Sequence, residues 1–331
     1  MKFSRLLTAV AASSVLSFAS ISIAQAESLK VLSSFTIIGD MVKNVGGEHV
    51  EVENLAGYDV DLHSFEPRAS DIKKLTSDVG AKLLFINGLE LEPWVERMIS
   101  SSSYEGQTIV LSEGIKAIKF ADIHEDDHHG HDHDHHEHHD HDHAHHHDHN
   151  HDHEHHHHGE WDPHAWQNPL NAVIYVENIL QALKATDPDN AQAYEVNAAS
   201  YIAEIKALHE EANKAFADLP EEKRRFGTNH EAFAYLAEAY DLTQVPVSGV
   251  SGAEPSAAQV GAVIETLRAE NVGAVFLENT TNNRLIEQIA RDAGVKVGGT
   301  LVADALQKEG EGSTYLGMMR KNTNTLLEAL K

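Results

Sequence analysis

Three histidines stand at positions where an α/β fold would present ligands. His63 follows a predicted strand at residues 50–55, His230 follows one at residues 225–228, and His164 lies at a junction that leads into a predicted helix. In open α/β sheets, ligands bind beyond the carboxyl ends of the strands. Three imidazoles at such places would supply three of the four ligands of a tetrahedral zinc site. The alternative is that each is a solvated or capping loop residue.

A fourth ligand has to come from elsewhere, and Asp304 is the first candidate. It follows the predicted strand at residues 295–302, so it has the same kind of position as His63 and His230. Its carboxylate would partly neutralise a divalent ion while the imidazoles stay neutral. Asp304 could instead be the N-cap of a short helical turn, a common role for Asp. Glu66, a water molecule or a histidine from the tract described next are competing fourth ligands.

Residues 124–158 form a tract of unusual composition. Its 35 residues include 21 histidines and 11 acidic residues, and no large apolar residue occurs among them. Such a segment cannot bury apolar surface, so we expect it to be disordered. Near pH 7 its neutral imidazoles can bind Zn(II), Cu(II) or Ni(II). We expect weaker, additional Zn(II) here, with the tract recruiting or sensing zinc; a tag or a solvated charge run is the alternative.

The N-terminus has the pattern of a secretory signal peptide. Lys2 and Arg5 precede an apolar run at residues 6–23, and the small-residue sequence AQA at 24–26 fits a cleavage site. The chain has no cysteine, which excludes disulfides and a lipid-modified N-terminal cysteine. We therefore expect residues 1–26 to be removed and the mature protein to be exported to a bacterial periplasm.

The net charge of −27 argues against a nucleic-acid partner and favours attraction of cations. Eleven of the negative charges lie in the histidine-rich tract, so the remainder of the chain is still clearly acidic. After the signal segment, no apolar run approaches the roughly 20 residues that span a bilayer.

Short β-rich runs alternate with helical runs on both sides of the tract, which indicates parallel sheets with helices on both faces. The predicted strands cover residues 29–33, 50–55, 82–86, 108–111, 225–228, 244–247, 272–277 and 295–302. The predicted helices cover residues 36–45, 69–78, 92–99, 168–184, 189–218, 231–240, 254–269, 283–293 and 315–330.

The helix at 189–218 contains no Gly or Pro, and its apolar residues recur every three or four positions. At about 45 Å it is longer than one small domain needs. We therefore predict an α/β fold of two similar lobes, each a mainly parallel sheet flanked by helices, joined by one long spine helix. The expected divisions are an N-terminal lobe at 27–186 that includes the tract, a linking helix at 187–220 and a C-terminal lobe at 221–331.

Several motifs follow one another in the order of a known family. They are DLHSFEP at 61–67, NGLE at 87–90, EPW at 92–94, WDPHAW at 161–166, NHEAFAYL at 229–236, EPS at 254–256 and LVADAL at 301–306. With them the chain resembles the metal-binding subunits of bacterial zinc and manganese ABC importers, most closely the periplasmic zinc-uptake proteins of the ZnuA type. The match covers nearly the whole mature chain. An acidic, histidine-rich loop before the second ligand motif is likewise a feature of the zinc members.

The resemblance implies that the metal lies between the lobes and is delivered to a membrane permease driven by a cytoplasmic ATPase. Its implied ligands are His63, His164, His230 and Asp304. Manganese members have a carboxylate at the third of these positions, whereas this chain has His230, which favours Zn(II). Some zinc members have Glu immediately before the first histidine, where this chain has Leu62, so the coordination number stays open.

Two other functions would each account for part of the sequence. Residues 153–157 (HEHHH) formally match the HExxH motif of zinc hydrolases, but that motif requires a helix with an apolar face, which this segment lacks. A periplasmic buffer or chaperone for Cu, Ni or Mn would use the tract but would not need two lobes and a spine. We therefore expect a monomeric solute-binding protein for Zn(II) whose partner is an ABC permease, and not an enzyme.

Overall fold

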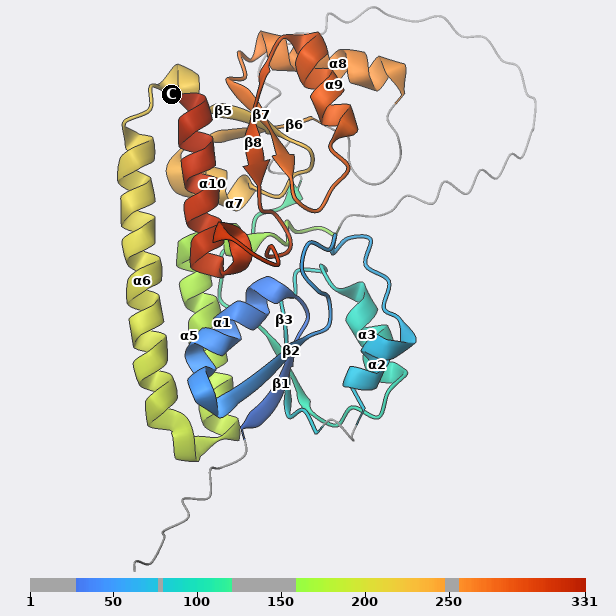
Figure 1. The fold of residues 1–331 in the computed structure, drawn as a ribbon, viewed down its shortest axis with the longest axis vertical. Coiled ribbons are helices and arrows are strands. Elements are labelled where there is room, and N and C mark those ends of the chain that lie inside the picture. The colour runs from blue at the N-terminus through green and yellow to red at the C-terminus, as the bar shows by residue number, and fades with distance from the viewer. Residues whose placement is uncertain (1–27, 77–79, 121–158, 248–255) are drawn as a thin grey trace, which may run out of the picture.

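The computed structural model describes residues 28–76, 80–120, 159–247 and 256–331 of the 331-residue chain (Figure 1). The predicted signal segment 1–26, the tract 124–158 and the HExxH-like residues 153–157 lie outside these residues. Within the described ranges, no helix has both the length and the apolar character needed to cross a bilayer.

The N-terminal lobe is built on a four-stranded sheet in the order β2-β1-β3-β4, with every neighbouring pair parallel. Its strands are β1 (Leu29–Ser33), β2 (Val50–Asn54), β3 (Leu83–Ile86) and β4 (Gln107–Val110). Its helices are α1 (Thr36–Gly46), α2 (Ala69–Lys74) and α3 (Pro93–Ser100).

The C-terminal lobe repeats this topology in the strand order β6-β5-β7-β8, again all parallel. Its strands are β5 (Arg225–Thr228), β6 (Thr243–Pro246), β7 (Ala274–Glu278) and β8 (Lys296–Leu301). Its helices are α7 (Ala234–Tyr240), α8 (Ala257–Ala269), α9 (Arg284–Ala293) and α10 (Tyr315–Leu330). The predicted fold class is therefore confirmed, while the predicted lobe boundaries stay predictions.

Two consecutive helices connect the lobes, α5 (Pro169–Thr186) and α6 (Ala191–Ala217). Asn168 caps α5 by accepting a hydrogen bond from Leu170 N, and proline occupies the first helical position. α6 runs alongside both lobes (Figure 1). It buries one stripe of residues at helical spacing: Tyr194, Ala198, Tyr201, Ile205, Leu208, Ala212 and Phe216.

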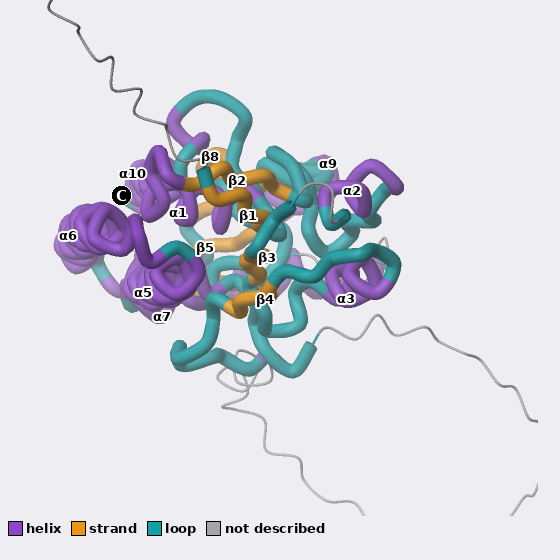
Figure 2. The backbone as a smooth tube through the Cα atoms, turned by 90° about the horizontal axis from the view of Figure 1, so that it is seen from below, coloured by secondary structure: helices purple, strands orange, loops and turns teal. Residues whose placement is uncertain are grey.

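One hydrophobic core extends through both lobes. Phe35 and Val42 of the N-terminal lobe belong to the same buried cluster as Phe226, Phe276 and the α6 stripe. Viewed from below, α1, α5, α6 and α10 lie on one side of the strands, and α2, α3 and α9 lie on the other (Figure 2). Smaller clusters cover the second face of each sheet. The sheets are thus fixed against a shared set of helices.

The helix predicted at 231–240 is wrong in its first turn, because α7 begins only at Ala234. The backbone before it is held in a non-helical loop by side chains. Thr228 Oγ1 donates to His230 O at 2.8 Å, and Gln244 donates to the same oxygen at 2.9 Å while accepting from Phe233 N at 3.1 Å. These bonds outweigh the local helical preference and fix the loop that carries His230.

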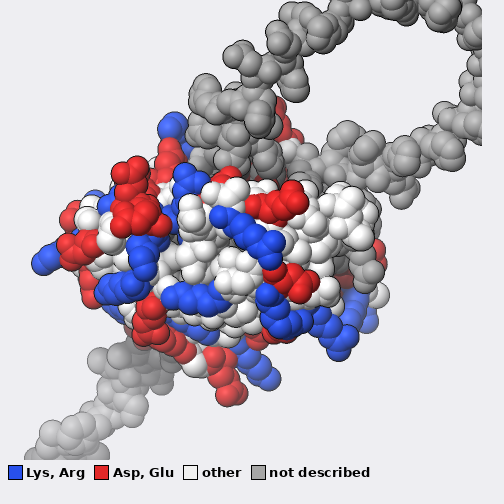
Figure 3. Space-filling view, turned by 90° about the horizontal axis from the view of Figure 1, so that it is seen from above, with Lys and Arg blue, Asp and Glu red and all other residues white. Residues whose placement is uncertain are grey.

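The face seen from above carries mixed charge. Lys and Arg side chains lie among Asp and Glu side chains rather than forming a patch of one sign (Figure 3). In the C-terminal lobe Arg225 pairs with Glu270 at 2.7 Å, and Arg224 pairs with Asp241. These two arginines are thus each paired with a nearby carboxylate.

Glu92 is a buried carboxyl group at the start of α3, with 6% of its surface exposed. It accepts hydrogen bonds from Ser34 Oγ at 2.7 Å, Asn87 N at 2.8 Å and Gly88 N at 3.1 Å. These bonds join the ends of β1 and β3 to α3. Burial raises the pKa of Glu92 to about 7, although the three donors act in the opposite direction.

This raised pKa predicts a pH-dependent contribution to stability. Between about pH 4.5 and pH 7 the folded protein keeps a proton on Glu92 that the unfolded chain releases, so the free energy of unfolding should fall as the pH rises. Glu92→Gln does not titrate and is the reference. Relative to it, the free energy of unfolding of metal-free wild type should fall by about 3 kcal/mol across this window. Urea unfolding at several pH values measures the difference.

Glu96→Gln on the exposed face of α3 is the matched control and should leave the pH profile unchanged. A constant difference between wild type and Glu92→Gln over the whole window would contradict the prediction.

Candidate metal centre

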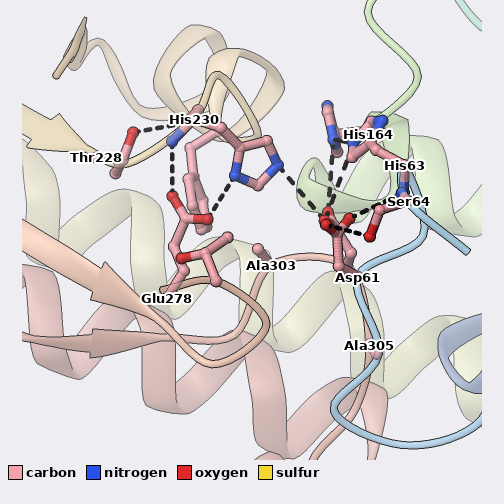
Figure 4. A network of polar contacts seen from close by, with 12 residues as sticks. Asp61, His63, Ser64, His164, Thr228, His230, Glu278, Ala303 and Ala305 are labelled. Atoms are coloured by element: carbon pink, nitrogen blue, oxygen red, sulfur yellow. Dashed lines mark hydrogen bonds and ion pairs between the residues drawn. The ribbon is translucent and has the colours of Figure 1, made fainter. Parts of the chain in front are cut away.

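Four side chains from both lobes meet at one point, and they are the four predicted ligands: His63, His164, His230 and Asp304. Their ligand atoms all lie within 4.8 Å of one another. Figure 4 shows how the three histidines lie around this point. His63 lies in the loop after β2, His230 follows β5 and Asp304 follows β8. His164 immediately precedes the short helical turn Ala165–Gln167 that leads to α5.

The spacing of these atoms suits a small tetrahedral ion. His63 Nε2 lies 3.0 Å from His164 Nε2, and Asp304 Oδ1 lies 3.4 Å from His164 Nε2. Asp304 Oδ2 lies 3.5 Å from His230 Nε2 and 3.9 Å from His63 Nε2. Ligands at 2.0–2.1 Å from a tetrahedral zinc ion are about 3.3 Å apart. The cluster therefore has the dimensions of a site for one small divalent metal ion.

The inner polar atoms of the cluster lack hydrogen-bond partners. His230 Nε2 and both oxygens of Asp304 are buried and unpaired. Buried polar groups are normally hydrogen-bonded, and each exception requires an explanation. A cation at the centre would satisfy all three atoms. The alternative role of Asp304 as an N-cap is wrong, because neither oxygen accepts a hydrogen bond; Glu66 is exposed and does not belong to the cluster.

Two of the imidazoles are oriented by carboxylates on their outer side. Asp162 Oδ1 lies 2.7 Å from His164 Nδ1 and also accepts from His164 N at 2.9 Å. Glu278 Oε2 pairs with His230 Nδ1, and Oε1 accepts from His230 N at 3.0 Å. With a proton on each Nδ1, the lone pair of each Nε2 faces the centre.

Sequence reasoning missed both of these carboxylates. Asp162 had a signal, since it lies two residues before His164 in the WDPHAW motif. Glu278 ends β7, which is hydrogen-bonded to β5, and His230 follows β5. The side-by-side position of the two strands is what brings Glu278 to His230, so only the sheet order could have indicated this pairing.

The third histidine is held differently. Asp61 Oδ1 accepts a hydrogen bond from His63 N at 2.9 Å, and Asp61 Oδ2 accepts from Ser64 Oγ at 2.8 Å. These bonds shape the backbone of the loop. The side chain of His63 is 33% exposed and that of His230 is 25% exposed, compared with 2% for His164 and 1% for Asp304. His63 and His230 therefore lie on the solvent side of the cluster.

A buried network also supports His164 from the N-terminal lobe. Asn87 donates from Nδ2 to Pro163 O at 2.9 Å, and its Oδ1 accepts from Tyr175 Oη at 2.6 Å. Its backbone N–H is bonded to Glu92. The residue before His164 is thus tied to the end of β3 and to α5.

The charges of the neighbouring groups shift the pKa values of His63, His230 and Asp304. Burial lowers the pKa of His63 to about 4, with the neighbouring imidazoles adding to the effect and Asp304 opposing it. For His230, burial alone would lower the pKa, but the charges of Glu278 and Asp304 outweigh it and raise the pKa well above its usual value. For Asp304, burial is likewise outweighed, and the facing imidazoles hold its pKa below the usual range. Asp304 is therefore an anion in a site built to receive positive charge.

Three imidazoles and a carboxylate lie together between two α/β lobes, and one long helix runs along both lobes. This arrangement defines a solute-binding protein for a metal ion. The chain belongs to the family described as zinc-uptake complex component A, periplasmic, whose sequence model matches residues 31–329. This family is the substrate-binding component of a transporter and not a class of enzymes.

Curated relatives and solved structures agree with this assignment. The chain is 30% identical to the iron-binding protein YfeA of Yersinia pestis, over 98% of this chain and 95% of the relative. It is 29% identical to the manganese-binding lipoprotein MntA of Halalkalibacterium halodurans, over 92% and 89% of the two chains. A manganese-bound periplasmic metal-binding protein from Candidatus Liberibacter asiaticus superposes with a TM-score of 0.74 at 28% identity, covering 92% of this chain and 100% of that one.

The orientation of His230 by Glu278 gives a testable prediction. Glu278→Gln leaves one oxygen to serve both N–H groups of His230, and a neutral amide makes the imidazole a weaker donor to a metal. Loss of such a partner typically weakens metal binding by about 10- to 100-fold. Zinc affinity, measured by competition with a chromogenic chelator, should fall in this range.

The control is Glu270→Gln, a change of the same chemistry at a surface ion pair with Arg225, which should leave zinc affinity unchanged. Equal affinities for Glu278→Gln and wild type would show that Glu278 does not orient a ligand.

Proposed function

We propose that this protein captures Zn(II) in the periplasm and delivers it to the membrane permease of an ABC importer. The observation that carries the proposal is the closed cluster of three Nε2 atoms and one carboxylate between the lobes. Four protein ligands leave no open coordination position, which suits a carried ion rather than a catalytic one. His63, His164, His230 and Asp304 are the proposed ligands.

The donor set favours zinc over the other metals named among the relatives. Imidazole suits Zn(II), whereas carboxylate, carbonyl and water oxygens suit Mn(II). Here only one of the four proposed ligands is a carboxylate. The relatives named for manganese and iron show that the family's metal varies, so selectivity has to be argued from this chain's own donors. Those donors are nitrogen-rich.

The residues that flank the histidine-rich tract in the sequence lie close to this site. Lys119 and Trp161 form an antiparallel bridge, and Trp161 is only three residues before His164. Zinc held weakly by residues 124–158 would therefore be released near the proposed ligands. We propose that the tract recruits or senses zinc, with an affinity below that of the site between the lobes.

Deletion of residues 124–158 should leave one tight zinc site per chain, because none of the proposed ligands belongs to the tract. Isothermal titration of the deleted protein measures the number of sites. In the full chain, His230→Ala should weaken the tight site by more than about 100-fold, since removing a ligand costs more than removing the partner that orients it.

His209→Ala on α6, where the ring contacts Tyr240, is the matched control and should bind as wild type. Loss of tight binding on deletion of the tract would overturn the ligand assignment.

Metal competition tests the choice of zinc. Full-length protein at equal concentrations of Zn(II) and Mn(II) should hold zinc in the tight site, because the nitrogen-rich donor set and the general order of divalent affinities both favour it. Dialysis followed by elemental analysis measures the bound metal. A protein that retained manganese under these conditions would contradict the proposed function while leaving the four-residue site intact.

A further inference from the structure

The side chain of Asn279 is hydrogen-bonded to both residues that flank Asp304. Its Oδ1 accepts a hydrogen bond from Ala303 N at 3.2 Å, and its Nδ2 donates to Ala305 O at 3.0 Å, so one amide group grips the residues on either side of Asp304. The backbone N–H of Asn279 also donates to Leu301 O at 3.2 Å. The backbone on either side of the buried carboxylate is thus fixed to the end of β7.

The same amide reaches the other lobe. Asn279 Nδ2 also donates to Asp59 Oδ1 at 3.0 Å. Asp59 belongs to the loop of the N-terminal lobe that carries His63, and its backbone N–H donates to Leu306 O at 3.1 Å. Asp59 Oδ2 further accepts from Lys308 N at 3.4 Å. The loop that carries His63 and the loop that carries Asp304 are therefore joined.

Asn279 also directly follows Glu278, the residue that orients His230. Two consecutive residues at the end of β7 thus hold two of the proposed ligands, one through Glu278 and the other through Asn279. Through its bond to Asp59, Asn279 also holds the loop of a third proposed ligand, His63. No other described side chain is bonded to both residues that flank Asp304 and also to the loop of His63.

We infer that Asn279 is a positioning residue of the metal site, which sets Asp304 and ties it across the lobes to the loop of His63. This inference rests on the proposed function, since it assigns Asn279 a role in binding the metal without contacting it. Asn279 needs two donors and one acceptor to do so. An aspartate of the same shape would direct an oxygen at Asp59 and at Ala305 O, both of which are acceptors.

Asn279→Asp in the full-length protein tests the inference. We expect its affinity for Zn(II) to fall by about 10- to 100-fold, the usual effect of losing a residue that positions a ligand. The visible absorption of bound Co(II), which reports the number and symmetry of the ligands, should also change. Asn282→Asp is the matched control, because that side chain is exposed and its oxygen, which accepts from Arg284 N, is retained.

A reciprocal exchange isolates the bond between the lobes. Asp59→Asn combined with Asn279→Asp restores a donor opposite an acceptor at this contact, although not at Ala305. The double variant should regain about fivefold in affinity, the equivalent of one ordinary hydrogen bond. Should Asn279→Asp fail to fold, Asn279→Ser, whose hydroxyl is too short to make the three contacts, serves the same comparison.

The free energy of unfolding of the metal-free proteins separates a positioning role of Asn279 from a role in general stability. Unchanged zinc affinity and an unchanged Co(II) spectrum in folded Asn279→Asp would overturn the inference, as would a double variant no tighter than Asn279→Asp. If wild type and Asn282→Asp themselves lack a tight zinc site, the proposed function fails. If both bind tightly and Asn279→Asp binds equally well, only the role of Asn279 is wrong.

Discussion

The buried charge of Asp304 is the constraint on which the rest of the site depends. Its side chain is 1% exposed and neither oxygen has a hydrogen-bond partner. Taking a carboxylate out of water costs several kcal/mol even after relaxation. The surrounding imidazoles offset part of this cost, which is why they hold the pKa of Asp304 low and why the pKa of His230 is raised. A divalent cation would offset it with two charges at once.

A buried carboxylate of this kind can exist only where the backbone that carries it cannot move toward solvent. Hydrogen bonds from both lobes hold the backbone around Asp304 in place. Asn322 on α10 accepts from Val302 N and donates to Val302 O, both at 2.8 Å. From the opposite lobe, Thr36 Oγ1 on α1 accepts from Leu306 N at 2.9 Å. Trp166 Nε1 donates to Ala303 O at 3.1 Å. The residues around Asp304 are thus immobilised by three different helical segments.

The sequence pointed to the four residues of this cluster because their signals are local. His63, His230 and Asp304 each follow a run of β-rich residues, and ligands bind at the carboxyl ends of such strands. The two-lobed fold was also predictable, from alternating runs and the apolar stripe of α6. The strand order was not, since the positions of Glu278 beside His230 and of Asn279 beside Asp304 depend on which strands are neighbours. The strand order depends on contacts between residues that are 24 to 48 positions apart in the sequence.

The shared core also limits how the site can open. Phe35, Phe226 and the stripe of α6 belong to one buried cluster, so a wide separation of the lobes would expose apolar surface at about 25 cal/mol per Å². It would also break buried hydrogen bonds such as that from Leu306 N to Thr36. The loop of His63 shares these restraints, because Leu62 belongs to the same buried cluster and Asp59 is hydrogen-bonded to the loop of Asp304, but the ring of His63 is one-third exposed. The cluster thus consists of a buried inner part, His164 and Asp304, and two partly exposed histidines, His63 and His230, at its edge.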